Sequence, residues 1–127
     1  MKDVTSQMLA KAHELIEVSE VLYERSFFES VANRAYYANF TALNALFFQT
    51  DLNAKSHKGA HIQFNLHFIS NGKLPGELNE ILVASFEKRQ DSDYDFGVAI
   101  SGEEASKLIE DSRHFVDSIQ KFIKVEK

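Results

Sequence analysis

The sequence predicts an all-α protein: an up-and-down bundle of four long helices plus one short helix. Apolar residues recur at three- and four-residue intervals along most of the 127 residues. No segment alternates apolar and polar residues as a half-buried strand does. The helix-breaking residues Gly72, Pro75 and Gly97 fall between the periodic stretches. We therefore expect a single helical domain that spans residues 1–127.

The first two helices are predicted from amphipathic spacing. Over about residues 5–24, apolar side chains at helical intervals are separated by charged ones, which is typical of a helix with one buried face. Over residues 28–49 the apolar arc is broader, which indicates a central helix with neighbours on more than one side. The small residues Ala35, Ala38 and Ala42 would let one of these neighbours approach closely.

The third and fourth helices are predicted from start and stop signals. Ser56 can cap a short third helix, and residues 71–72, an Asn-Gly pair, tolerate the left-handed backbone that follows a helix C-terminus. Pro75 then suits the first turn of a fourth helix, where its missing N–H costs nothing. We expect this helix to fade over residues 89–94.

The last helix is predicted from a capping box. Residues 95–100 contain a glycine and indicate a loop. Ser101 and Glu104 after it have the spacing at which each side chain bonds the other residue's backbone N–H. The helix that begins there carries apolar residues at helical spacing as far as Phe122.

Composition and charge exclude several classes of function. Without cysteine the chain has no disulfide scaffold, thiolate zinc site, iron–sulfur cluster or cysteine nucleophile. The net charge of −5 is the wrong sign for coating nucleic acid, so any contact with RNA must be local. The N-terminal residues do not resemble a signal peptide, and no apolar run reaches membrane-spanning length. We therefore expect a cytoplasmic protein that does not contact a membrane.

Two polar clusters are candidates for a site. At the end of the fourth helix, Arg89 is followed by three aspartates, Asp93 among them, and by Tyr94. On the apolar central helix, Asn33, Arg34 and Tyr37 need polar partners. A guanidinium there is costly unless it meets a carboxylate, so we expect Arg34 to pair with an aspartate at residue 91 or 93. The alternative is that both clusters only lock two helices together.

The one basic stretch of the chain runs from residue 51 to residue 75, with three lysines and three histidines against a single aspartate. Lys55, His57, Lys58 and His61 lie in the part of it where the third helix starts. The two histidines are four residues apart and would share a helix face, but a metal site needs three or four ligands. The lysines and the free N–H groups of the helix start could instead bind a phosphate. The remaining alternative is an ordinary solvated helix start.

These pieces together resemble a known family, the HEPN domain, and specifically its small stand-alone prokaryotic members. The resemblance covers nearly the whole chain and rests on the order and spacing of several short motifs. They are Asn33-Arg34-Ala35-Tyr36-Tyr37-Ala38-Asn39-Phe40, then Ser56-His57-Lys58-Gly59 followed by Phe64, then Arg89 with Asp93-Tyr94-Asp95, and finally the capped last helix.

The resemblance implies a homodimer, and for many members a minimal nucleotidyltransferase partner in a toxin–antitoxin pair. In active members an Arg-x4–6-His motif from both subunits cleaves RNA without a metal, the arginine steadying the phosphate and the histidine doing acid–base work. Arg89 fits the first role. Tyr94 stands where the histidine is expected, and no histidine follows before residue 100. A phenol can donate a proton or bind a phosphate.

The sequence thus favours a HEPN-type binding module that takes a nucleotide or an RNA end and needs no metal or cofactor. Arg89 and Tyr94 are the expected catalytic pair, if there is catalysis. The other expected ligand-binding residues are Asn33, Arg34, Tyr37, His57, Lys58 and Asp93. Two alternatives stay open: a metal-independent ribonuclease toxin that uses Arg89 with Tyr94 or with a histidine from elsewhere, and a purely structural helical adaptor.

Overall fold

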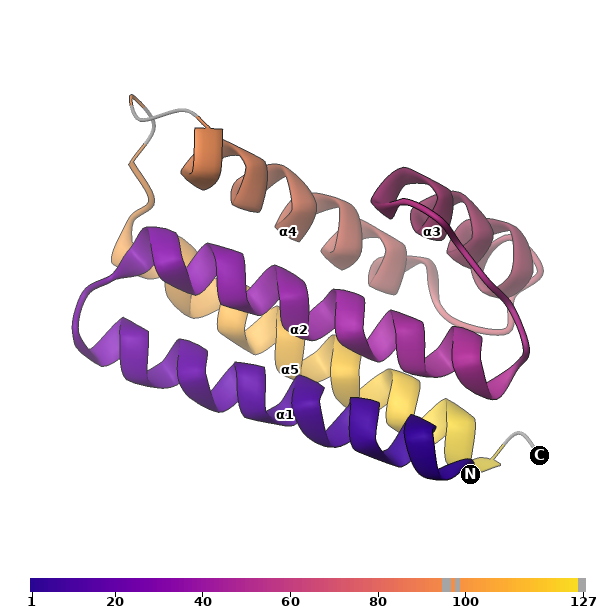
Figure 1. The fold of residues 1–127 in the computed structure, drawn as a ribbon. Helices are drawn as coiled ribbons and strands as arrows, with labels where there is room; N and C mark the ends of the chain where they lie inside the picture. Colours follow the sequence, from indigo (N-terminus) through magenta and orange to yellow (C-terminus); the bar gives the residue numbers. More distant parts are fainter. Residues whose placement is uncertain (95–96, 98, 126–127) are drawn as a thin grey trace.

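The computed structural model describes residues 1–94, 97 and 99–125 and contains the predicted helical bundle (Figure 1). The four long helices are α1 (Asp3–Glu24), α2 (Phe28–Gln49), α4 (Gly76–Tyr94) and α5 (Gly102–Val125). The short helix α3 (His57–Phe64) continues into one turn of π-helix, η1 (Asn65–Ile69). The described residues contain no strand, so the all-α prediction is confirmed.

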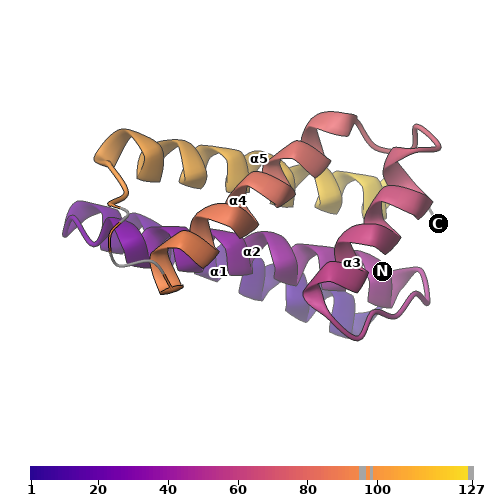
Figure 2. The same cartoon turned by 90° about the horizontal axis from the view of Figure 1, so that it is seen from above.

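α2 is the central helix, as its broad apolar arc predicted. It packs against α1, α4 and α5, and α3 lies beside the first half of α4 (Figures 1 and 2). Five alanines of α2 are completely buried, and these small side chains leave room for neighbours on several sides. The alanines are Ala32, Ala35, Ala38, Ala42 and Ala45.

The helix ends follow the predicted signals closely. Ser56 Oγ accepts the Gly59 N–H at 2.9 Å, and Ser101 and Glu104 form the reciprocal capping box with bonds of 3.1 and 3.2 Å. Gly72 has the left-handed φ of 78° expected after a helix C-terminus. The loop predicted over residues 95–100 includes residues 95, 96 and 98, which lie outside the described residues.

Three details differ from the predictions. The third helix is not a regular α-helix throughout. The Ser70 N–H donates a hydrogen bond of 2.8 Å to Asn65 O, five residues earlier, which closes a π-helical turn. Pro75 directly precedes α4 instead of lying in its first turn, and its carbonyl accepts the Leu78 N–H at 3.1 Å. α4 does not fade but stays helical to Tyr94.

α4 is held to the core as far as Phe86, whose ring is partly buried against the core. Its buried residues are Leu78, Leu82 and Ser85, and none follows Ser85 before the helix ends. Ser85 Oγ accepts a hydrogen bond of 3.1 Å from the fully buried amide of Asn39.

The last two turns of α4 make polar contacts with both neighbours, through Lys88 with Glu104 of α5 and through Arg89 and Asp93 with α2. The contacts with α2 form the candidate site.

Among the described residues, no helix is both long enough and apolar enough to cross a bilayer.

Candidate functional site

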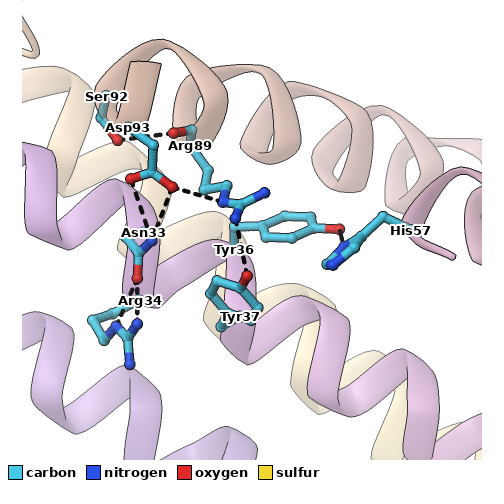
Figure 3. Close-up of polar contacts among 8 residues, drawn as sticks. All are labelled: Asn33, Arg34, Tyr36, Tyr37, His57, Arg89, Ser92 and Asp93. Atoms are coloured by element: carbon cyan, nitrogen blue, oxygen red, sulfur yellow. Dashed lines mark hydrogen bonds and ion pairs between the residues drawn. The ribbon is translucent and has the colours of Figure 1, made fainter. Parts of the chain in front are cut away.

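The centre of the site is the guanidinium of Arg89, which is fixed from two sides (Figure 3). One turn further along α4, Asp93 brings Oδ2 to 3.0 Å from Arg89 Nε as an ion pair. From α2, the Tyr37 hydroxyl accepts a hydrogen bond of 3.0 Å from Arg89 Nη2. The Arg89 side chain is only 15% exposed and that of Asp93 27%. Burial of this kind strengthens both contacts and makes the loss of either partner costly.

Two aromatic rings of α2 complete the environment of Arg89. Its guanidinium carbon lies 5.2 Å from the ring centroid of Tyr37 and 5.9 Å from that of Tyr36, within cation–π range of both. Tyr37 also borders Arg34, whose guanidinium carbon is 5.6 Å from its ring centroid. Tyr37 therefore connects the two arginines of the site.

The predicted ion pair of Arg34 with an aspartate is wrong. Arg34 donates from Nε, at 2.9 Å, and from Nη2 to the Asn33 amide oxygen, and the described residues give it no carboxylate partner. Asp93 is already paired with Arg89, because a spacing of four residues on one helix brings those two side chains together. Asn33 bridges the helices instead, with its Nδ2 at 3.3 and 3.4 Å from the two Asp93 carboxylate oxygens.

Among the described residues of one chain, Arg89 and Tyr94 make no contact, because five residues along a helix turn the second side chain by about 140° relative to the first. The groove between two subunits that both residues were expected to face stays a prediction. Tyr94 is 73% exposed. The one-turn neighbour of Arg89 that reaches the guanidinium is Asp93.

The first residue of α3 joins the site through a buried phenol. Tyr36 is completely buried, and its hydroxyl lies 2.7 Å from His57 Nδ1 and 3.3 Å from His61 Nε2. His57 stacks on Phe40 with the ring centroids 4.1 Å apart. The predicted shared face of the two histidines is therefore real, but its partner is a tyrosine. Among the described residues no group of three metal ligands forms around them.

This phenol and its two imidazoles are uncharged at neutral pH. Burial and, second, the Arg89 charge lower the pKa of His57, while burial and then His57 lower the pKa of His61. Burial raises the pKa of Tyr36, with Arg89 opposing part of the increase and Tyr37 adding a little to it. The network is therefore neutral although it lies beside a guanidinium.

An open groove of about 380 Å³ lies next to the Arg89 cluster. Asn33, Arg34 and Asp93 line it together with Glu29 and two serines, Ser30 and Ser92. It is the place where a ligand can reach the polar side chains of α2 and α4. Lys58, by contrast, lies next to His57 on α3 and is exposed, with no hydrogen bond or ion pair to another described residue.

The contact of Tyr36 with the two histidines was not predicted from the sequence. Tyr36 entered as part of the motif over residues 33–40, and His61 as a residue on the same helix face as His57. One signal was available: a tyrosine on a buried stripe carries a hydroxyl that needs a partner. The identity of that partner, a histidine pair 21 and 25 residues away, depends on how α3 folds back over α2.

Comparison with known proteins places the chain in a family. The HEPN domain model matches residues 5–122, and the chain belongs to the HEPN family. "Putative toxin MJ0142" of Methanocaldococcus jannaschii is 32% identical over 92% of this chain and 80% of the relative. "Putative toxin MJ0605" of the same organism is 31% identical over 97% of this chain and 93% of the relative. A UPF0332 protein of Thermotoga maritima is 31% identical over 89% and 86%.

Proposed function

We propose that this HEPN-family chain is the toxin-like member of a toxin–antitoxin pair and binds a nucleotide or an RNA end in the groove beside Arg34. The observation that supports the proposal is that the two arginines differ in how many guanidinium donors are already used. Arg89 is immobilised by Asp93 and Tyr37, whereas Arg34 uses only Nε and Nη2, both toward one amide oxygen. The remaining donors of Arg34 can take a phosphate oxygen. The relatives named as putative toxins support the toxin-like role.

The charges of the groove favour an RNA end over a long phosphate backbone. Glu29 and Asp93 line the groove together with Arg34, and Asp93 is largely neutralised by Arg89. The groove therefore offers positive charge for one phosphate group, while a carboxylate nearby would repel a second one. Carboxylates are also good acceptors for ribose hydroxyls, which are present in RNA and partly absent in DNA.

Replacing Arg34 with glutamine is expected to weaken binding of a short single-stranded RNA roughly 10- to 100-fold, because a charge-assisted contact is worth about 1.5–3 kcal/mol. Fluorescence anisotropy of a labelled RNA with a terminal phosphate, in the presence of a chelator, measures the effect. Arg113→Gln is the matched control, since Arg113 is an exposed arginine paired with Glu20 on another face. DNA of the same sequence should bind more weakly.

Wild-type protein that binds neither RNA nor a nucleotide at micromolar concentration would contradict this function. The structural adaptor would then be the better interpretation, because the Arg89 cluster also joins α2 to α4 without any ligand.

A homodimer and a minimal nucleotidyltransferase partner belong to the same proposal, as the family resemblance implies. Large apolar side chains stay exposed at the end of α1 and in the turn after it, which is surface that a second copy could cover. They are Val18, Val21, Tyr23 and Phe27. We expect light scattering at micromolar concentration to give the mass of two chains, and a monomer would contradict the dimer.

A metal-independent ribonuclease is the second candidate, and one observation favours it. The histidine that is missing after Arg89 has a possible substitute, because α3 brings neutral His57 to Tyr36 and thereby to the Arg89 cluster. A neutral imidazole at pH 7 is suited to acid–base work.

A further inference from the structure

The hydroxyl of Tyr36 is bonded to two imidazoles at once and has a single proton to share. If the phenol donates to His57 Nδ1, then His61 Nε2 must donate to the phenol oxygen, and both rings carry their proton on Nε2. If the phenol donates to His61 Nε2, then His57 Nδ1 must donate, and both rings carry it on Nδ1. The two histidines are therefore expected to change tautomer together.

The imidazole at each end of this hydrogen-bond chain has a second ring nitrogen with no hydrogen-bond partner among the described residues. Among the described residues, His57 bonds only through Nδ1, and His61 bonds only through Nε2. His57 borders Tyr37 with ring centroids 6.1 Å apart, and Tyr37 in turn contacts Arg34 and Arg89. His61 instead lines a separate groove with Asn65 and Asn79. The His57 end thus adjoins Tyr37, which contacts both arginines, and the His61 end borders an open groove.

We propose that Tyr36 couples His57 and His61 into a proton relay, and that His57 is the acid that the relay supplies at the Arg89 cluster. His57 Nε2–H gives its proton to a ligand oxygen while Nδ1 takes the phenol proton. The phenol oxygen takes the proton of His61 Nε2, and His61 Nδ1 takes one from water in its groove. One proton enters and one leaves, so no imidazolium forms.

The surroundings of His57 explain why such a relay is useful. The groups that face it are Tyr36, Tyr37 and Phe40 of α2, Phe86 and Arg89 of α4, and His61 of its own helix. None is a carboxylate, and the nearest formal charge is the guanidinium of Arg89, which disfavours a second positive charge. A lone histidine here would be a poor proton donor at neutral pH, whereas a relayed one never has to become charged.

This inference rests on the proposed function, since it assigns a reaction to RNA bound beside Arg34. The 2′-oxygen bonds to phosphorus, the bond from phosphorus to the 5′-oxygen breaks, and the 2′-hydroxyl proton goes to water. The leaving 5′-oxygen takes the proton of His57 Nε2. The products are a 2′,3′-cyclic phosphate and a 5′-hydroxyl, and the balance needs no oxidant, reductant or further reactant.

The test compares cleavage of a labelled single-stranded RNA, in a chelator, by the wild type and by three variants. We expect His57→Gln to lower the single-turnover rate about 100-fold or more, in the range of general acid–base contributions. Tyr36→Phe and His61→Gln should lower it at least about tenfold while Kd changes less than about twofold. Tyr23→Phe and His67→Gln, which change the same residue types elsewhere, should cleave as the wild type does.

The pH profile separates a relay from a merely structural tyrosine. The wild-type rate should stay level between about pH 6.5 and 8, because neutral His57 is the acid. In Tyr36→Phe the acid has to be an imidazolium, so the rate should fall about tenfold per pH unit over this range. If Tyr36→Phe does not fold, His61→Gln, which also breaks the relay, should show the same fall.

Three outcomes would overturn the relay. If the RNA binds but is not cleaved, the proposed reaction is contradicted and the proposed binding function stands. If the RNA does not bind, the proposed function itself is contradicted. A wild-type pH profile in folded Tyr36→Phe removes the coupling. Nitrogen NMR of the two rings tests the coupling without any activity, and it fails if His57 and His61 carry opposite tautomers in the wild type.

Discussion

Replacing Arg89 with methionine is expected to lower the free energy of unfolding by about 2–3 kcal/mol, the largest effect of any single change in the polar cluster. The substitution keeps the length of the side chain but leaves the Asp93 carboxylate, which is 27% exposed, without its cation. It also removes the donor that the Tyr37 hydroxyl accepts from. Chemical denaturation monitored by circular dichroism measures the change.

The control for this prediction is Arg113→Met, which breaks an exposed pair with Glu20 and should cost less than about 1 kcal/mol. The double variant Arg89→Met with Asp93→Leu should recover part of the lost stability, since it no longer buries an unpaired carboxylate. An effect of Arg89→Met no larger than that of Arg113→Met would show that the cluster contributes little to the fold.

Replacing Phe64 with alanine is expected to cost more, about 3–5 kcal/mol, because it opens a cavity in the core. Phe64 is completely buried at the end of α3, with ring centroids 6.1 Å from Phe68 and 5.8 Å from Phe115 of α5. α3 is only eight residues long, and its other buried residue is Ala60. Phe64 is therefore the main apolar attachment of the helix that carries both histidines.

Removing the Phe64 ring should consequently disturb the two histidines of α3 as well as lower the stability of the whole protein. We expect the unfolding midpoint of Phe64→Ala to fall and the side-chain signals of His57 and His61 to broaden or shift in NMR spectra of the folded variant. Phe64→Leu refills most of the volume and should cost clearly less. Phe48→Ala, at an exposed position away from the proposed dimer surface, should cost less than about 1 kcal/mol. Equal costs for Phe64→Ala and Phe48→Ala would contradict the anchoring role.

The helices could be predicted from the sequence because their signals are local. The bounds of α2 agree with the prediction since its apolar period starts and stops sharply at Phe28 and Gln49. The capping box at Ser101 involves two residues three apart and needs no tertiary context. The π-helical turn after Phe64 was not predictable in this way, because one extra residue in a turn leaves almost the same apolar spacing.

The site was predictable only in part, for the same reason. Arg89 was identified as the central group, and its pairing with Asp93 follows from a spacing of four residues on one helix. The prediction that Asp93 pairs with Arg34 was wrong. The sequence alone does not show which of the two arginines lies closer to the carboxylate. The link from Tyr36 to His57 joins residues on different helices and depends on the path of the chain between them.

The polar end of α4 has a consequence for how a ligand would act. Apolar side chains hold α4 to the core no further than Phe86, so the polar contacts of Lys88, Arg89 and Asp93 fasten its last two turns. A phosphate that drew the guanidinium away from Tyr37 would compete with the very contact that keeps this helix end in place. Binding of a ligand that contacted Arg89 would therefore be thermodynamically linked to detachment of the helix end, and a partner protein could sense such a ligand as a loosened helix.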